Sequence, residues 1–146
     1  MFIRELATAD AIPSLEATIQ FASARQRILA HNIANIDTPD FIQKDVPPAE
    51  FQTLLGEAVN RRRERWGGHR GELGFRSTRA IRADDHGGFR LLPQEPRPGL
   101  LFHDRNNRDV ERLMQDQVEN VSQHRVATEL LRSRYNQLGT AIAGRI

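Results

Sequence analysis

A regular spacing of apolar residues runs along the N-terminal part of the chain. From residue 12 the apolar positions recur alternately three and four residues apart, which is the period of an α-helix. They are Ile12, Leu15, Ile19, Ala22, Leu29, Ile33 and Ile36, with Gln26 as a polar interruption. This predicts one helix of about 22 residues, near 33 Å long, with Asp10 as a candidate cap. So narrow a stripe is typical of a coiled-coil seam, and Phe21 and Ile28 lie off it, facing a second neighbour.

The C-terminal part of the chain carries a longer pattern of the same kind. Its seam positions are Val110, Met114, Gln117, Val121, His124, Thr128, Leu131, Tyr135, Leu138 and Ile142. They predict a helix of more than four heptads, about 50 Å long. Candidate caps precede it at Asn106, Asn107 and Asp109. Because the middle of this seam is polar while Leu113, Val118, Ala127, Leu130 and Ala141 broaden the apolar surface, we expect contacts with several helices at once.

Between the two long helices the pattern is shorter and irregular. An amphipathic helix is predicted from Ala49 to about Arg65. Residues 67–99 hold seven of the ten glycines and three of the seven prolines. Within them, Arg79 to Ala83 and Phe89 to Leu92 favour a small β-hairpin that lies against a helix or another subunit, with a flexible loop as the alternative.

These elements predict a mainly α-helical fold. Elongated N- and C-terminal helices pack as a coiled-coil-like hairpin with their termini together, around an irregular middle rich in Gly, Pro and Arg. The corresponding segments are 1–45, 46–104 and 105–146. Two helices alone bury too little surface to be well stabilised, so we expect assembly to supply the missing burial.

Composition excludes several classes of protein. The chain has no cysteine, so it forms neither disulfides nor thiolate metal sites. No apolar run is long enough to span a membrane, and the N-terminus lacks the pattern of a cleaved signal peptide. The net charge of +2 is uneven, because residues 61–108 hold twelve Arg and six acidic residues.

The basic run Arg61 to Trp66 is the best candidate for a nucleic-acid site, since Arg neutralises phosphates and Trp stacks on bases. A solvated helix end with arginines near its C-terminus explains the same residues and is favoured. His69, His86, His103 and the Asp84–Asp85 pair match no standard metal-ligand spacing. We find no catalytic constellation, and we expect neither an enzyme nor a cofactor.

The end of the first helix carries the most specific pattern in the chain. Asn35 tolerates the left-handed conformation that closes many helices, and Pro39 cannot continue one, so a turn is predicted here. The run from Leu29 to Pro39, Leu-Ala-His-Asn-Ile-Ala-Asn-Ile-Asp-Thr-Pro, closely resembles the signature L-A-x-N-I-A-N-x-D-T-P-G-Y of the bacterial flagellar rod, hook and hook-filament junction proteins. Only the final Gly-Tyr differs, being Asp40-Phe41 here.

A looser resemblance extends over residues 10–45 and 104–146. Residues 106–114 are similar to the N-x-V-D-x-x-x-E-M motif that opens the C-terminal helix in that family. The short middle and the ending from Tyr135 to Ile142 resemble the proximal-rod class more than the longer distal-rod and hook relatives.

The resemblance implies a structural role in the rod of the flagellar basal body, in the periplasmic space. It implies export by the flagellar type III apparatus without a cleavable signal peptide. Expected partners are further copies of the chain, other rod proteins, the rod adaptor and the membrane ring. The expected assembly residues are Leu29, Asn32, Ile33, Asn35, Asp37, Thr38, Pro39, Val121, Leu131, Tyr135, Leu138 and Ile142. The alternatives are a cytoplasmic coiled-coil adaptor and a nucleic-acid-binding helical protein.

Overall fold

The computed structural model of the protein describes residues 11–68, 71–84, 87–95 and 110–144. These residues form three helices and a small sheet, which confirms the mainly α-helical fold. The elements are α2 (Ala11–Ala34), α3 (Pro48–Trp66), β1 (Ile81–Ala83), β2 (Phe89–Leu91) and α4 (Val110–Ile142). Several residues singled out in the sequence lie outside the described ranges: Asp10, His69, Asp85, His86, His103, Asn106, Asn107 and Asp109.

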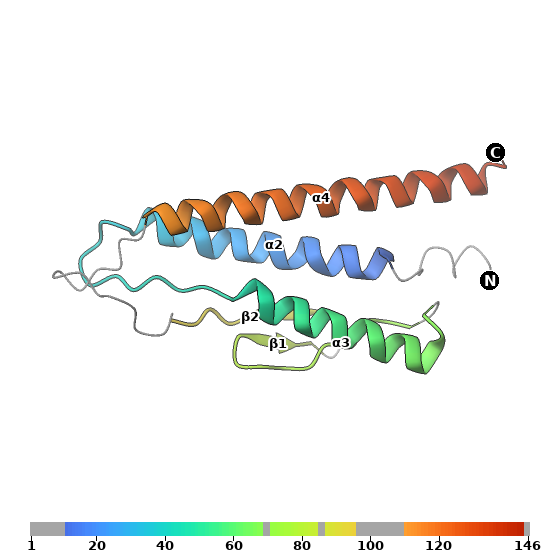
Figure 1. Ribbon diagram of the computed structural model, residues 1–146, viewed down its shortest axis with the longest axis horizontal. Helices are drawn as coiled ribbons and strands as arrows, with labels where there is room; N and C mark the ends of the chain where they lie inside the picture. Colours follow the sequence, from blue (N-terminus) through green and yellow to red (C-terminus); the bar gives the residue numbers. More distant parts are fainter. Residues whose placement is uncertain (1–10, 69–70, 85–86, 96–109, 145–146) are drawn as a thin grey trace.

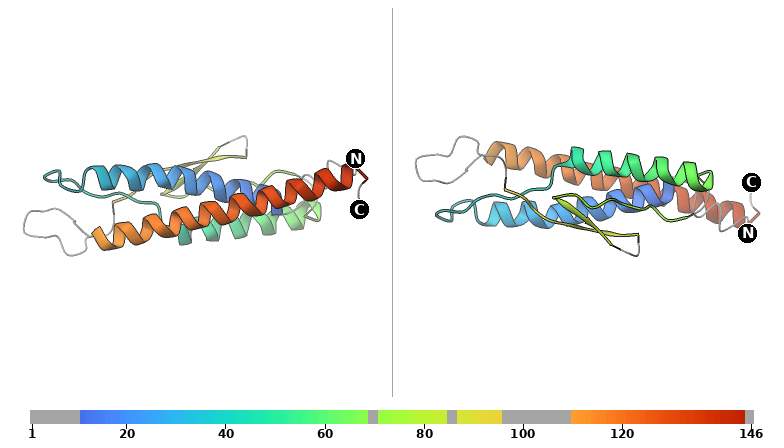
Figure 2. Two further views of the ribbon diagram at one scale, coloured as in Figure 1. Left: turned by 90° about the horizontal axis from the view of Figure 1, so that it is seen from above. Right: turned by 90° about the horizontal axis from the view of Figure 1, so that it is seen from below.

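Helix α2 is the central element of an elongated molecule. It lies between α4 on one side and α3 with the hairpin on the other (Figure 1). Helices α2 and α4 run antiparallel, so the start of α2 and the end of α4 lie at the same end, and the views from above and below agree (Figure 2). The predicted antiparallel hairpin of terminal helices is therefore confirmed.

The apolar core lies between α2, α3 and the hairpin. The ring of Phe21 on α2 stacks on that of Phe51 on α3, with centroids 4.2 Å apart and an interplanar angle of 7°. Phe89 from β2 lies against Phe51 with centroids 5.4 Å apart. Ile28 packs against the same cluster. The second neighbour expected for Phe21 and Ile28 is thus formed by the middle segment of the chain.

Helix α3 begins and ends where its sequence allows. Pro48 stands in its first turn, where the missing N–H costs nothing. At its end Gly67 adopts φ 66°, and its N–H donates to the carbonyl of Arg63 at 2.9 Å. A glycine carries no penalty in this left-handed conformation.

The predicted hairpin is present and lies against the helices. Strands β1 and β2 are antiparallel, with Arg82 opposite Arg90. Ile81 and Phe89 point into the core, whereas the two arginines are exposed. Alternation along strands of only three residues therefore attaches the hairpin to the helices.

The predicted seam of α4 is wrong in its orientation. The buried residues of this helix are Leu113, Asn120 and Ala127, which are seven residues apart. Val110, Met114, Val121, Tyr135 and Ile142, all on the predicted seam, are exposed. The apolar pattern located the hydrophobic side of the helix. The line that meets α2 runs beside the predicted seam, through Leu113, Asn120 and Ala127.

Helix α2 buries residues of the predicted seam and also the face that carries Phe21. Ile12, Ala22 and Leu29 of the predicted seam are buried, but so are Ala17, Phe21, Arg25 and Asn32. The helix buries this much wider face because it contacts α4 on one side and the apolar core on the other.

Candidate functional site

The signature turn, residues 35–41, follows directly on α2, which ends at Ala34. The side-chain amide of Asn35 donates to the carbonyl of His31 at 2.8 Å. The N–H of Thr38 donates to the carbonyl of Asn35 at 2.9 Å, and that of Phe41 to the carbonyl of Thr38 at 3.2 Å. Consecutive hydrogen bonds thus bend the chain away from the helix, as the sequence predicted.

Asp40 takes the place of the signature's glycine and keeps a glycine-like conformation. Its φ is 59°, and it is the only non-glycine residue with positive φ in the described parts of the chain. Asn35 is therefore not the left-handed residue. Asp tolerates this region better than most residues because its short side chain bonds locally. Asp40 therefore adopts this conformation at a modest cost.

Asn32 fastens the far side of the turn to α2. Its Nδ2 donates to the carbonyl of Lys44 at 2.7 Å, and the N–H of Lys44 donates to its Oδ1 at 3.1 Å. The side chain is almost fully buried. A buried amide that is satisfied on both its donor and its acceptor holds two segments in one arrangement.

Arg25 forms a second attachment of the same segment, together with Asp45. The guanidinium is 2% exposed. Its Nε donates to Oδ1 of Asp45 at 2.9 Å and its Nη2 to Oδ2 at 2.6 Å, a bidentate pair. Nη2 also lies 3.3 Å from Oδ1 of Asp116 on α4. One buried cation therefore joins α2, the segment after the signature turn, and α4; we call Arg25, Asp45 and Asp116 the charged junction.

Burial and charge act in opposite directions on Arg25. Desolvation lowers the pKa of its guanidinium, but the hydrogen bond and the charge of Asp45, with those of Asp116, raise it more. The net pKa is above its ordinary value, so Arg25 stays protonated inside the molecule. The junction is held by a permanent positive charge.

Two further polar contacts align α4 with α2. Nδ2 of Asn120 donates to the carbonyl of Ala22 and to Oε1 of Gln26, both at 2.9 Å. Near the other end of the pair, the hydroxyl of Tyr135 donates to Oε1 of Glu16 at 2.9 Å. That hydrogen bond, with desolvation and the charge of Glu16, raises the pKa of Tyr135. A polar residue at a seam position is a known way to select one register.

The structure places the expected assembly residues in three environments. Leu29 and Asn32 are buried within the chain, and Ile33, Asn35, Leu131 and Leu138 are half-buried. The exposed residues are Asp37, Thr38 and Pro39 on the signature turn and Val121, Tyr135 and Ile142 on α4. Their role in assembly stays a prediction.

Sequence reasoning assigned no role to the residues of the charged junction or to Asn120. Arg25, Asp45 and Asp116 are far apart in the chain, and charged residues are normally solvated. The observable signal was weak: Arg25 lies among apolar residues of α2, close to Phe21 and Leu29.

Helix α4 carries an apolar surface that the rest of the described chain does not cover. Eight of the ten exposed large hydrophobic residues in the described parts are on this helix. By helical periodicity, Val110, Met114, Val118 and Val121 lie on one flank of the α2 contact and Val126 and Leu130 on the other. Apolar residues gathered on one exposed element make α4 a candidate interaction surface.

The basic run at the end of α3 does not form one exposed face. Arg62 is buried, and Nη2 of Arg61 donates to the carbonyl of Gly74 at 2.8 Å. Arg63 and Arg65 stand in the last turn of the helix, and Trp66 is exposed. This arrangement agrees with the favoured prediction of a solvated helix end, since arginines are favourable near a helix C-terminus.

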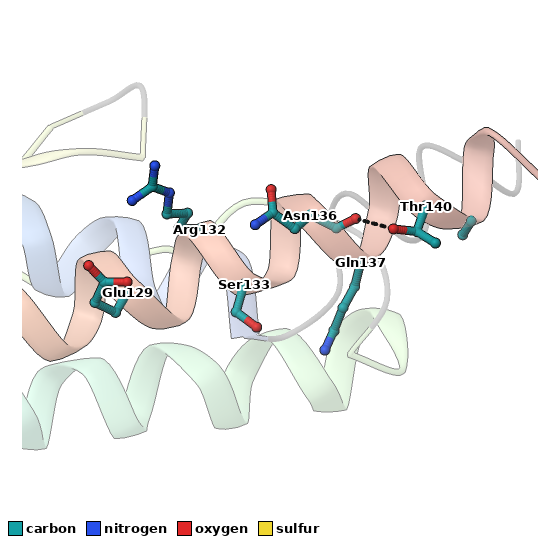
Figure 3. A pocket seen from close by; sticks show the side chains of 7 residues that line it. Glu129, Arg132, Ser133, Asn136, Gln137 and Thr140 are labelled. Carbon is teal, nitrogen blue, oxygen red and sulfur yellow. Dashed lines mark hydrogen bonds between the residues drawn. The ribbon is translucent and has the colours of Figure 1, made fainter. Parts of the chain in front are cut away.

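One hollow in the described surface lies along α4. It measures about 560 Å³ and is lined by residues that include Glu129, Arg132 and Asn136, and all of its described lining belongs to α4 (Figure 3). No group of three potential metal ligands occurs among the described residues. No helix in those residues is long and apolar enough to cross a bilayer.

Comparison with known proteins gives one relevant similarity. No protein family model matches the chain. The chain is 27% identical over 133 residues to the flagellar basal body rod protein FlgB of Bacillus subtilis (strain 168). The alignment covers 91% of this chain and 93% of that protein. The similarity supports the resemblance that the signature predicted and extends it through the middle segment.

Proposed function

We propose that this chain is a structural subunit of the proximal rod of the bacterial flagellar basal body. The observation that carries the proposal is the similarity to a rod protein along almost the whole of both chains. The chain forms the signature segment as a hydrogen-bonded turn, and Asp40 has a positive φ of 59°, a conformation that glycine adopts readily. The role is structural and not enzymatic.

Assembly takes place through the terminal helices. The two apolar flanks of α4 are available to neighbouring subunits, because the chain itself covers only the line through Leu113, Asn120 and Ala127. Two different flanks suit a heterologous interface, which builds an open tubular assembly instead of a closed dimer. In the rod, such a tube transmits motor torque to the hook.

The proposed partners are copies of this chain, other rod proteins, and the adaptor and membrane ring at the base of the rod. The subunit reaches them through the flagellar type III export apparatus and is located in the periplasmic part of the basal body. Exposed residues Asp37, Thr38 and Pro39 of the signature turn then contact a neighbour, as do Val121, Tyr135 and Ile142 of α4.

The first test is mass spectrometry of basal bodies purified from the source organism. We expect the chain among the rod proteins of the wild type, and motility to be lost on deletion of its gene and restored by the wild-type gene. Its absence from well-formed basal bodies would overturn the proposal. Salt-sensitive binding to nucleic acid that disappears on neutralising Arg63 and Arg65 would favour the alternative instead.

The signature turn allows a more specific test. Asn35→Ala removes the bond to the His31 carbonyl, and Pro39→Ala frees the turn; we expect both to reduce incorporation into basal bodies more than export. Gln52→Ala, an exposed change on α3, is the matched control and is expected to assemble normally. Incorporation of both turn variants at the wild-type level would contradict a role for the turn in assembly.

A further inference from the structure

The charged junction joins the two parts of the chain to which the proposed function assigns contacts. Asp45 belongs to the segment that leaves the signature turn, and Asp116 belongs to α4, yet both acids bind the same guanidinium of Arg25. We infer that Arg25 couples them, so that an ordered signature segment favours docking of α4 on α2 and a docked α4 stabilises the segment. The inference rests on the proposed function only for its biological use, since the coupling is a property of one chain.

Asp45 fixes the orientation of the Arg25 guanidinium. Asp45 engages both Nε and Nη2, at 2.9 and 2.6 Å, and this fork fixes the plane of the group. In that plane the same Nη2 reaches Asp116 at 3.3 Å. Without the Asp45 carboxylate, the buried guanidinium of Arg25 would keep only that of Asp116, at the longer distance of 3.3 Å. A buried charge with too few partners is unfavourable, so water would be drawn in and the seated position of α4 weakened.

Helix α4 can separate from α2 without opening the apolar core. The described apolar core contains residues of α2, α3, the hairpin and their connections, but none of α4. The buried residues of α4 are Leu113, Asn120 and Ala127, of which only Leu113 is a large apolar side chain. Opening between α2 and α4 can therefore leave the apolar core closed, and it is this local opening that the junction controls.

Asp45 is connected with the signature turn through the segment that Asn32 holds. Lys44, its neighbour, is held by both hydrogen bonds of Asn32. The backbone of Asp45 itself pairs with that of Gln94, with both N–H to carbonyl distances at 3.0 Å. A neighbouring molecule that orders or displaces the signature turn therefore acts on a segment fixed next to Asp45. Contact at the turn is in this way transmitted to the apolar flanks of α4.

The absence of cysteine from the chain allows a direct test with single-cysteine reporters on the purified chain in dilute solution. The Ala127→Cys reporter lies in the contact between α2 and α4, and the Ala58→Cys reporter lies in the core. Reaction of each thiol with a soluble disulfide reagent measures opening of its surroundings. The test variant is Asp45→Asn, which keeps an oxygen for Nε and for the N–H of Val46 while replacing the other oxygen by a donor.

We expect Asp45→Asn to raise the labelling rate of the Ala127→Cys reporter on the order of tenfold, and that of the Ala58→Cys reporter much less. In the Asp116→Asn background, Asp45→Asn is expected to raise this labelling rate severalfold less, because the ion pair between Arg25 and Asp116 is already lost. Coupling is reciprocal, so Asp116→Asn is expected to raise severalfold the hydrogen-exchange rate of the Lys44 N–H, which donates to Oδ1 of Asn32. Glu57→Gln, which removes a carboxylate from the exposed pair with Arg76, is the control and leaves all rates unchanged.

Three outcomes would overturn the inference. One is an effect of Asp45→Asn that is the same with and without Asp116. Another is equal acceleration of the core reporter, which would indicate global destabilisation. The third is rapid labelling of the Ala127→Cys reporter in the otherwise unchanged chain, since α4 would then not be docked. None of these results bears on whether the chain is found in basal bodies, so the proposed function is tested separately.

Discussion

The two sides of α2 are covered in different ways. On one side, α3 and the hairpin bury a continuous apolar cluster that includes Phe21, Phe51 and Phe89. On the other, α4 meets α2 along a line of one large apolar, one polar and one small residue, and carries eight exposed hydrophobic side chains. The first side is completed by the chain itself. The second leaves these side chains of α4 uncovered, and under the proposed function other molecules cover them.

This difference separates what one chain needs to fold from what many chains need to assemble. Burial of apolar surface is the main favourable term in both processes. Here it is divided between them, so a substitution on the α3 side and one on the outer face of α4 should affect different measurements.

Truncating the core should have the largest effect. Phe51→Ala removes a fully buried ring that contacts Phe21, Phe75 and Phe89, and should lower the free energy of unfolding by about 3–5 kcal/mol. Leu130→Ala, at an exposed position of α4, should change it by less than about 0.5 kcal/mol. Urea unfolding followed by circular dichroism measures both. Equal losses would mean that the outer face of α4 is not independent of the fold.

Removing the cation of the charged junction, which connects the two sides, should have the next largest effect on stability. Arg25→Ala leaves Asp45 and Asp116 without their shared cation and opens space beside α2, with an expected loss of about 3 kcal/mol. The control is Arg76→Ala, whose side chain is 65% exposed and pairs with Glu57; the expected loss is below about 1 kcal/mol. Thermal unfolding of the two variants at one pH provides the comparison. Similar losses would show that the junction is no stronger than a surface pair.

Replacing Asp40 should stabilise the molecule without touching either side of α2. With φ 59°, Asp40 occupies a region where a side chain is unfavourable, so Asp40→Gly should raise the free energy of unfolding by about 0.5–1 kcal/mol. The matched control is Asp37→Gly in the same turn, which lacks positive φ and should gain nothing. Urea midpoints measure both changes. A loss of stability in Asp40→Gly would show that its side chain contributes more than its backbone conformation costs.

The smallest effect is expected at the contact between Tyr135 and Glu16. The hydrogen bond to Glu16 raises the pKa of Tyr135 above its ordinary value of 10.0. A raised pKa in the folded state means that the contribution is complete below pH 10 and is lost as the pH rises through the folded-state value. Because the side chain is exposed, the loss should be about 0.5 kcal/mol or less. Tyr135→Phe should remove this alkaline dependence from a series of unfolding curves above pH 9; an unchanged dependence would assign it to other groups.

Much of the architecture follows from local patterns in the sequence. The spacing of apolar residues located α2, α3 and α4 close to their observed bounds, because helical period is a local property. The hairpin was predicted from two short apolar runs around a turn-forming segment. Asn35 and Pro39 marked the end of α2 because both act on the backbone nearby.

The rest depended on contacts between distant parts of the chain. No local pattern indicates that Arg25 is buried, since its two carboxylates come from residues 45 and 116. The sequence identified Asn32 only as part of the signature, whereas in the structure its side chain binds the main chain of Lys44. The orientation of α4 was missed for another reason: apolar spacing identifies surfaces that avoid water, but not whether the same chain or a neighbour covers them.

The paired hydrogen bonds of Asn32 have a consequence for how the turn can vary. The side chain of Asn32 both donates to and accepts from the main chain of Lys44, as one strand does with its neighbour in a sheet. The loop between residues 32 and 44 is therefore closed at its base, whatever residues lie between. Lengthening a loop that is already closed costs little, about 0.6 kcal/mol for each doubling of its length. The tip around Asp37 to Pro39 can therefore accept inserted residues while α2 and α3 stay in place. A short peptide tag carried there would project from one end of the molecule and report on which neighbours approach it.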